Sequence, residues 1–290
     1  MTYAGVELGG TKCVAILARR DGEVLARETV PTTSPDETLE RIERTLLGWK
    51  QDAGFEALGI ASFGPVDVDP GSTTYGHVLA TPKPEWEGTN VARLGKAAGV
   101  PWTFDTDVNA AALAEMHWGS GRGLADFAYV TVGTGIGVGL IVNGRPTRGF
   151  AHCELGHARA PRFAGDDWPG SCPFHGDCIE GLASGSALAA RFGERMTDLK
   201  PDDPVWESVA WTLGQLCHVI VCAAAPLRIA MGGGVMEAQP HLLARAQTAL
   251  IESLNGYIRI PEDGDYVLAP ELGADAGPLG AIVLAMSAKR

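Results

Sequence analysis

The feature that most constrains the fold is a unit that occurs twice: an apolar strand, a Gly/Thr turn and a second apolar strand. The first copy reads YAGVEL, GGTK and CVAILA from residue 3, and the second reads FAYVTV, GTG and IGVGLIVNG from residue 127. Short apolar runs bounded by glycine predict buried strands. A unit that recurs predicts two related lobes. The sequence therefore predicts a two-lobed α/β protein.

Strand and helix patterns alternate between and after these units, as expected of the α/β class. Further strands are predicted at 22–30, 57–65, 100–107, 228–235 and 265–270. Helical spacing of apolar residues predicts helices at 34–50, 108–119, 206–225, 241–255 and 276–290, with another starting near Ile179. We predict an N-terminal lobe of residues 1–108, joined by the C-terminal helix 276–290, and a C-terminal lobe of residues 109–275.

Charge and composition limit the partners of the chain. A net charge of -12 and a pI near 5.0 disfavour nucleic acid and anionic membranes, because phosphate backbones are held by clustered Lys and Arg. The uncharged run 127–144 approaches membrane-span length, but its alternate glycines favour a pair of strands. The N-terminal residues lack the pattern of a secretory signal, so we predict a cytoplasmic location.

Three glycine-rich turns follow strands and are candidates for phosphate binding. They are Gly9–Lys12, Gly133–Gly137 and Gly232–Gly234. Glycine lets backbone N–H groups approach phosphate oxygens, threonine hydroxyls add donors and Lys12 adds positive charge. Each turn alone is more typical of an ordinary hairpin than of a phosphate site, and only the three together favour phosphate binding. None matches the P-loop pattern, and GTGIGVG within a hairpin argues against a Rossmann dinucleotide site.

Carboxylates stand at the ends of two predicted strands. Asp105 and Asp107 precede an Ala-rich helix, where Asp107 could accept a proton from a substrate hydroxyl. The alternative is that Asp107 or Asn109 only caps that helix. Glu7, beside the first glycine turn, could help to hold hydrated Mg²⁺, or it could be an edge-strand charge.

A cluster of cysteine and histidine predicts a metal site. Cys172, His175 and Cys178 follow a Cys-x2-His-x2-Cys pattern, and fourteen residues separate His157 from Cys172. Four N/S ligands match a closed tetrahedral zinc site, which leaves no open position for catalysis and is therefore structural. The alternative is a set of unconnected loop thiols and imidazoles. Cys217 and Cys222, in an apolar helical stretch, are expected to be buried.

The ordered set of these motifs resembles the ROK family of bacterial sugar kinases, and the fructokinase branch most closely. The segments that carry the resemblance are ELGGTKCVAIL, SFGPVD, DTDVNAAALAE, VTVGTGIGVGLIVNG, CELGH, CPFHGDCIEGLASG and MGGGV. The resemblance implies a two-lobed actin-like, ribonuclease-H-like fold, with ATP and sugar bound between the lobes. It also suggests a homodimer.

The resemblance implies a role for individual residues. Asp107 matches the catalytic base, and the sugar-binding positions are Gly64, Glu154, His157 and Glu180. The ATP-binding positions are Gly9, Gly10, Thr11, Lys12, Gly133, Thr134, Gly135, Gly137, Gly232, Gly233 and Gly234. His157, Cys172, His175 and Cys178 match the zinc ligands, with His157 offering its other ring nitrogen to a sugar hydroxyl. Thr106 and Glu7 depart from the commoner Asn and Asp of the wider family.

The expected activity is ATP-dependent phosphorylation of fructose at the 6-hydroxyl, with Mg²⁺. Glucose or mannose are the alternative sugars. Some members of the family are transcription repressors with an additional N-terminal helix-turn-helix, but here the first phosphate-loop strand begins within a few residues of Met1. A zinc-stabilised sugar sensor without turnover is the remaining alternative.

Overall fold

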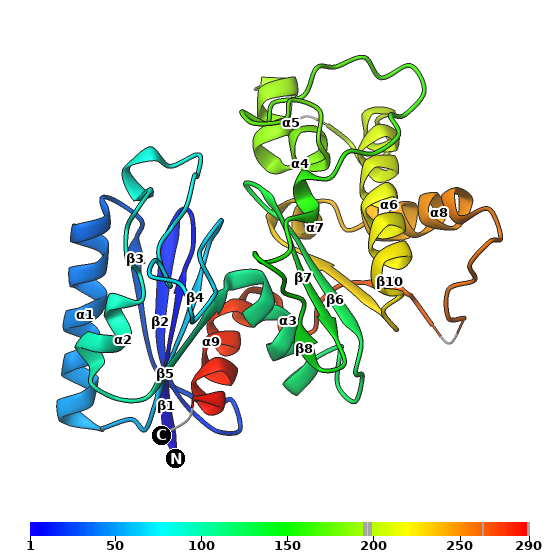
Figure 1. The fold of residues 1–290 in the computed structure, drawn as a ribbon. Helices are drawn as coiled ribbons and strands as arrows, with labels where there is room; N and C mark the ends of the chain where they lie inside the picture. Colours follow the sequence, from blue (N-terminus) through cyan, green and yellow to red (C-terminus); the bar gives the residue numbers. More distant parts are fainter. Residues whose placement is uncertain (194–195, 197–198, 263, 289–290) are drawn as a thin grey trace. The chain divides into compact units, whose positions relative to one another are not determined.

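The computed structural model describes residues 1–193, 196, 199–262 and 264–288, and it divides the chain into two compact units (Figure 1). Unit 1 contains residues 1–122, 147–152 and 274–290, and unit 2 contains residues 123–146 and 153–273. Each unit has its own five-stranded sheet. The last two residues of the predicted helix 276–290 lie outside the described residues, and the lobe boundary after residue 108 stays a prediction.

The sheet of unit 1 contains the first copy of the repeated unit. Its strands, in spatial order, are β3 (Val24–Pro31), β2 (Lys12–Arg19), β1 (Thr2–Leu8), β4 (Leu58–Ser62) and β5 (Trp102–Thr106). β1, β4 and β5 are parallel, and the register pairs Leu8 with Ser62 and Ser62 with Thr106. The loops that follow these strands therefore begin side by side at one edge of the sheet, at the carboxyl ends where ligands bind in many α/β proteins.

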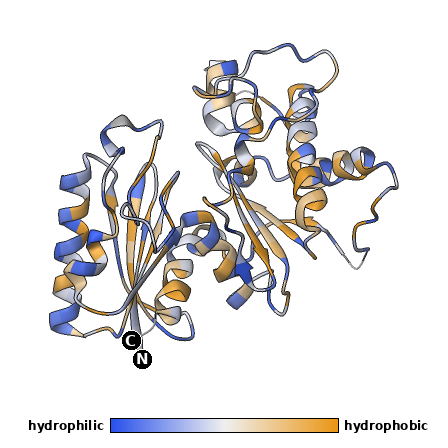
Figure 2. Ribbon diagram, viewed as in Figure 1, coloured by the Kyte–Doolittle hydropathy of each residue, from blue (hydrophilic) through white to orange (hydrophobic). Residues whose placement is uncertain are grey.

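Helices cover both faces of this sheet (Figure 1). α1 (Pro35–Asp52) and α2 (Arg93–Ala98) lie on one face, and α3 (Asp107–Trp118) and α9 (Ala276–Ser287) lie on the other. The 3-10 turns η1 (Pro84–Trp86) and η4 (Gly273–Asp275) lie in the segments that precede α2 and α9. α1 buries Leu39, Ile42 and Leu46, the spacing of one helical face. Its other side is polar (Figure 2).

Glycine lets α9 approach the sheet and α3 very closely. A Cβ atom on Gly59 of β4 would lie 1.8 Å from the carbonyl oxygen of Ala281, and one on Gly280 would lie 2.2 Å from the carbonyl group of Ala110. No side chain fits at either position. The backbone of α9 therefore packs directly against β4 and against α3.

The sheet of unit 2 contains the second copy of the repeated unit. Its strands, in spatial order, are β10 (Val267–Leu268), β9 (Ile229–Gly232), β6 (Phe127–Val132), β7 (Ile136–Val142) and β8 (Arg145–Pro146). The uncharged run 127–144 thus forms the predicted pair of strands. β9 is parallel to β6, with Gly232 opposite Thr131, so that the glycine turns after the two strands start at the same edge.

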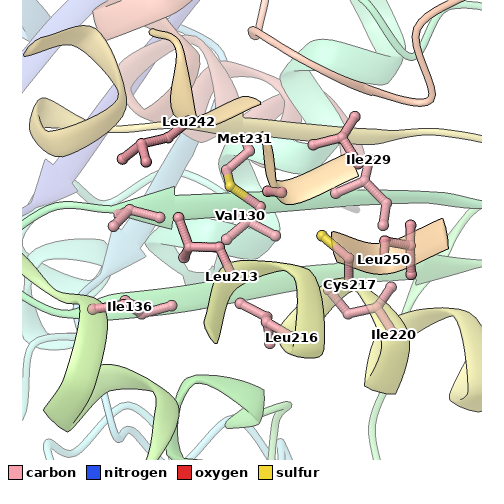
Figure 3. Close-up of a cluster of buried hydrophobic side chains, with 14 of the residues drawn as sticks. Val130, Ile136, Leu213, Leu216, Cys217, Ile220, Ile229, Met231, Leu242 and Leu250 are labelled. Atoms are coloured by element: carbon pink, nitrogen blue, oxygen red, sulfur yellow. The ribbon is translucent and has the colours of Figure 1, made fainter. Parts of the chain in front are cut away.

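The helices of unit 2 pack around an apolar core. They are η2 (Leu155–His157), α4 (Ile179–Ala183), α5 (Gly185–Phe192), α6 (Val205–Ala224), α7 (Gly234–Ala238) and α8 (Leu242–Leu254). Figure 3 shows Leu213, Cys217 and Ile220 of α6 packed with Val130 and Met231 of the sheet. The prediction that Cys222 is also buried is wrong: it lies on the exposed face of α6.

Among the described residues one helix, α6, is long and apolar enough to cross a membrane. Of its most apolar window, 61% is buried inside the protein, so its apolar residues serve as core.

Two glycine-to-alanine substitutions test the close packing of α9. Gly280→Ala should destabilise the protein by about 3 kcal/mol or more, because the new methyl group has to displace the backbone of α3. Gly48→Ala is the matched control, since Gly48 lies in α1 with nothing within 4 Å of its Cβ position. It should stabilise by about 0.5–1 kcal/mol. Urea unfolding measures both, and equal effects at the two positions would contradict the packing.

Candidate active site

The first glycine turn joins β1 to β2 and is held by its own backbone and by Thr32. The Gly9 N–H donates to the Lys12 carbonyl oxygen at 3.1 Å, and a Cβ on Gly9 would lie 2.5 Å from that oxygen. The Thr32 hydroxyl donates to the Gly9 carbonyl at 2.7 Å. Thr11 and Lys12 are exposed. The turn is therefore rigid, with its hydroxyl and ammonium groups open to a ligand.

Asp107 is the first residue of α3, directly after β5. The cap of this helix is Thr106, whose hydroxyl accepts from the Asn109 N–H at 3.2 Å. The alternative that Asp107 or Asn109 caps the helix is therefore wrong. Asp107 Oδ1 accepts from the Val108 N–H at 2.8 Å. Asp107 is therefore a residue of the first turn of α3 and not its cap.

Glu7 and Asp107 are two carboxyl groups whose pKa values are raised, chiefly by burial. Burial raises the pKa of Asp107 to about 7. Burial, and then the negative charge of Asp107, raise the pKa of Glu7 to about 7, although Lys12 and Arg27 lower it. A carboxylate with a pKa near 7 accepts a proton more readily than an ordinary aspartate. The pair therefore has the protonation behaviour of a general base beside a second acidic group.

The other two glycine turns lie together in unit 2. The Gly133 carbonyl accepts from the Gly185 N–H at 2.7 Å, at the start of α5. Gly233 has φ +93°, and a Cβ there would lie 2.7 Å from the Val132 carbonyl oxygen. Only glycine fits this close approach between the end of β6 and the turn after β9. Gly232–Gly234 and Gly133–Gly137 are thus neighbours at one sheet edge.

The structure brings the four predicted metal ligands together. The ligand atoms of His157, Cys172, His175 and Cys178 all lie within 4.8 Å of one another. His157 Nδ1 is 3.6 Å from both Cys172 Sγ and Cys178 Sγ, and His175 Nδ1 is 3.7 Å from Cys172 Sγ. Tetrahedral zinc, with bonds of about 2.3 Å to sulfur and about 2.0 Å to nitrogen, spaces such ligands by about 3.5 Å. The residues fit zinc, and the alternative of unconnected loop groups is wrong.

Glu180 connects this cluster to the second glycine turn. Glu180 Oε1 lies 3.8 Å from His157 Nε2, the ring nitrogen that faces away from the cysteines. Glu180 Oε2 accepts from the Ile136 N–H at 2.9 Å. A Cβ on Gly135 would lie 2.5 Å from the same oxygen. The Cys/His cluster, two predicted sugar-binding residues and a predicted ATP-binding turn therefore form one continuous region of unit 2.

The remaining predicted positions are placed within their own units. Glu154 is exposed, and its backbone carbonyl oxygen accepts from the His157 N–H at 3.0 Å. Gly64 belongs to unit 1 and follows β4. The structure adds Lys83, which the sequence analysis missed: its Cε is 3.5 Å from the Cβ position of Gly10. No local pattern in the segment TPKPEW marks Lys83 as a neighbour of the first glycine turn.

Comparison with known proteins identifies the family of the chain. Residues 3–288 match the sequence model of the ROK family. The chain belongs to the ROK family. A fructokinase of Zymomonas mobilis is 42% identical, covering 99% of this chain and 97% of its own. A fructokinase of Pediococcus pentosaceus is 37% identical over 99% of both chains. A glucokinase of Streptomyces coelicolor is less similar, at 31% identity over 68% of this chain.

Solved structures show that this ROK protein has the predicted fold. A ROK hexokinase of Thermus thermophilus is 28% identical, with a TM-score of 0.79 over 99% of this chain and 98% of that one. A ROK glucokinase of Streptomyces griseus, solved with glucose and AMPPNP, is 25% identical, with a TM-score of 0.78 over 99% of both. The predicted actin-like α/β fold of a ROK sugar kinase is confirmed.

The raised pKa values predict that Asp107 lowers the stability of this ROK protein. Its pKa is about 7 in the folded state and near 3.8 in an ordinary environment. Between these values the folded state retains a proton that the unfolded state has lost, so stability falls as the pH rises to about 7. Asp107→Asn should therefore raise the Tm by about 3 °C or more at pH 8, and by less at pH 5.5.

Differential scanning calorimetry at the two pH values measures this effect. Asp21→Asn, in an exposed turn, is the control and should leave the Tm within about 1 °C at both. A lower Tm for Asp107→Asn would mean that the carboxylate is stabilised by its surroundings, contrary to the raised pKa.

Proposed function

We propose that the protein is an ATP-dependent kinase that phosphorylates fructose at the 6-hydroxyl. The observation that carries this proposal is the edge of the unit 1 sheet, where the first glycine turn and Asp107 follow parallel strands in register. This edge combines a phosphate-binding turn with a base of raised pKa. The two near full-length relatives named fructokinase support fructose as the sugar.

In the proposed reaction the chain's own groups position and deprotonate the acceptor. The glycine turns hold the phosphates of ATP through backbone N–H groups, with Lys12 as a charge partner. Asp107 orients the 6-hydroxyl and takes its proton as the γ-phosphoryl group transfers. Glu7 would help to hold hydrated Mg²⁺, which supplies positive charge to the transferred phosphoryl group. Positioning then accounts for most of the rate.

Fructose is proposed to be held by Gly64, Glu154, His157 and Glu180. The His157 geometry supports a double role, because Nδ1 faces the cysteines and Nε2 faces Glu180. A metal at Nδ1 fixes the tautomer, so that Nε2 carries the proton and can donate to a sugar hydroxyl. We propose that the cluster holds structural zinc, which fixes the shape of the sugar-binding loop.

Other sugars and other properties follow from the family with less support. Glucose and mannose remain alternative substrates, since a more distant relative is named glucokinase. A cytoplasmic homodimer, with no nucleic acid or membrane partner, stays a prediction from the sequence. A sugar sensor without turnover would keep the zinc cluster but would not require the carboxylate of Asp107.

The proposed activity is tested by ADP formation with Mg²⁺-ATP and fructose, glucose or mannose, with NMR of the product to locate the phosphate. We expect fructose to be preferred and phosphorylated at the 6-position. Asp107→Asn should lower kcat by about 10²–10⁴-fold, because the amide cannot accept the proton. Asp21→Asn should retain the wild-type rate. Full activity of Asp107→Asn would remove Asp107 as the base, and no turnover by zinc-loaded wild type would favour the sensor.

The proposed zinc site is tested by metal analysis of the purified protein. We expect about one zinc per chain, and Cys172→Ser should lose it. The KM for fructose should then rise about tenfold or more, whereas the KM for ATP should change less than about threefold. Cys222→Ser is the matched control, because Cys222 is exposed on α6. A wild-type enzyme that is active without zinc would contradict the proposal.

A further inference from the structure

Arg148 connects a short segment of the chain to a buried carboxylate near Asp107. We call residues 147–152 the strap; they belong to unit 1, although unit 2 precedes and follows them in the sequence. Arg148 Nη2 donates to Asp105 Oδ2, and Arg148 Nη1 donates to the Val68 carbonyl oxygen at 3.3 Å. One guanidinium group thus joins the strap to β5 and to the loop after β4.

A second contact fixes the other end of the strap. His152 is buried, and its Nε2 accepts from the Val66 N–H at 3.1 Å. The strap therefore has two polar attachments to unit 1, four residues apart. Attachment at both ends restricts its motion, so that the Arg148 guanidinium has a defined place beside Asp105.

Asp105 in turn holds the beginning of α3. Its side chain is 1% exposed. Oδ1 accepts from the Thr106 N–H and from Asn109 Nδ2, each at 2.8 Å, and Oδ2 accepts from Arg148. A buried carboxylate requires such partners, because an unpaired charge in the interior is strongly unfavourable. Asp105 thus fixes the residue before Asp107 and the residue one half-turn after it.

We propose that Arg148 is a positioning residue for phosphoryl transfer, acting through Asp105 on Asp107. The inference rests on the proposed function. Without Arg148, the Asp105 carboxylate would be a buried anion with one partner fewer, and it would have to rearrange or take up a proton. Either change alters its bonds to the start of α3. Moving the proposed base by about 1 Å is enough to lower the rate about 100-fold.

The shape of the guanidinium group makes arginine specific at this position. Its fork reaches the Asp105 carboxylate and the Val68 carbonyl at the same time. Lysine is a single point charge on a flexible stem and can neutralise Asp105 without holding both partners. Lysine should therefore restore the charge and only part of the positioning.

Steady-state kinetics with fructose and ATP test the inference. Arg148→Met should lower kcat by about tenfold or more, with both KM values within about threefold of wild type. The kcat of Arg148→Lys should lie between that of wild type and that of Arg148→Met. Adding Asp105→Asn to Arg148→Met should recover part of kcat, because the amide leaves no unpaired charge. Arg145→Met is the matched control: Arg145 is exposed in β8, three residues before Arg148, and its loss should leave kcat unchanged.

The outcomes separate this inference from the proposed function. Wild-type turnover with an unchanged kcat in folded Arg148→Met overturns the positioning role alone. A rise in the KM for fructose with constant kcat also overturns the positioning role, because it would indicate that Arg148 acts in sugar binding instead. A lower Tm with a wild-type kcat per folded molecule overturns it as well, because it would indicate that the ion pair between Arg148 and Asp105 is purely structural. Absence of wild-type turnover overturns the proposed function, and this inference with it.

Discussion

The close approach of α9 to the sheet of unit 1 is the constraint on which the proposed active site depends. Glycine at positions 59 and 280 removes the side chains that would separate α9 from β4 and α3. At the start of the same helix, a Cβ on Gly277 would lie 2.0 Å from Glu7 Oε1. The helix therefore covers Glu7 and supports α3, whose first residue is Asp107. Removing water from these carboxyl groups raises their pKa values, so the packing that stabilises the fold also suits Asp107 to its proposed role as the base.

The parallel strands of the two sheets explain why residues far apart in the sequence meet. β1, β4 and β5 end in register, which aligns the first glycine turn, the loop that contains Gly64 and the start of α3. In unit 2, β6 and β9 end in register, which aligns the two other glycine turns. The strand order of each sheet thus brings together the candidate site residues of that unit. Small residues in the turns leave their backbone N–H groups open to a ligand.

The sequence was sufficient for features with a local signal. The repeated hairpins, the long helices and the spacing of the metal ligands all have a period or pattern that can be read from neighbouring residues. Arg148 and Lys83 have no such signal, because each meets its partner across more than forty or seventy residues, and an exposed-looking arginine or lysine predicts only a solvated surface. Cys222 was misplaced for a related reason: α6 is apolar on most sides, so its period does not reveal which face is exposed. Capping by Asp107 or Asn109 was an open alternative because Thr106, Asp107 and Asn109 are all good capping residues, and only the backbone geometry decides between them.

The two copies of the hairpin repeat are supported in different ways, and the difference suits phosphoryl transfer. In unit 1 the turn has Lys12 within it and Lys83 beside it, and these two positive charges favour the binding of phosphate at this turn. In unit 2 the turn is contacted by a carboxylate, because Glu180 Oε2 accepts from the Ile136 N–H. A carboxylate would repel a phosphate placed directly on it, yet it readily accepts from a sugar hydroxyl. In the proposed function Gly133–Gly137 holds phosphates of ATP and Glu180 holds fructose. The hydrogen bond of 2.9 Å from the Ile136 N–H to Glu180 Oε2 would then link the ATP-binding turn directly to the fructose-binding residue. Such a link keeps the reacting groups in a fixed relation, which a kinase requires because positioning supplies most of its rate.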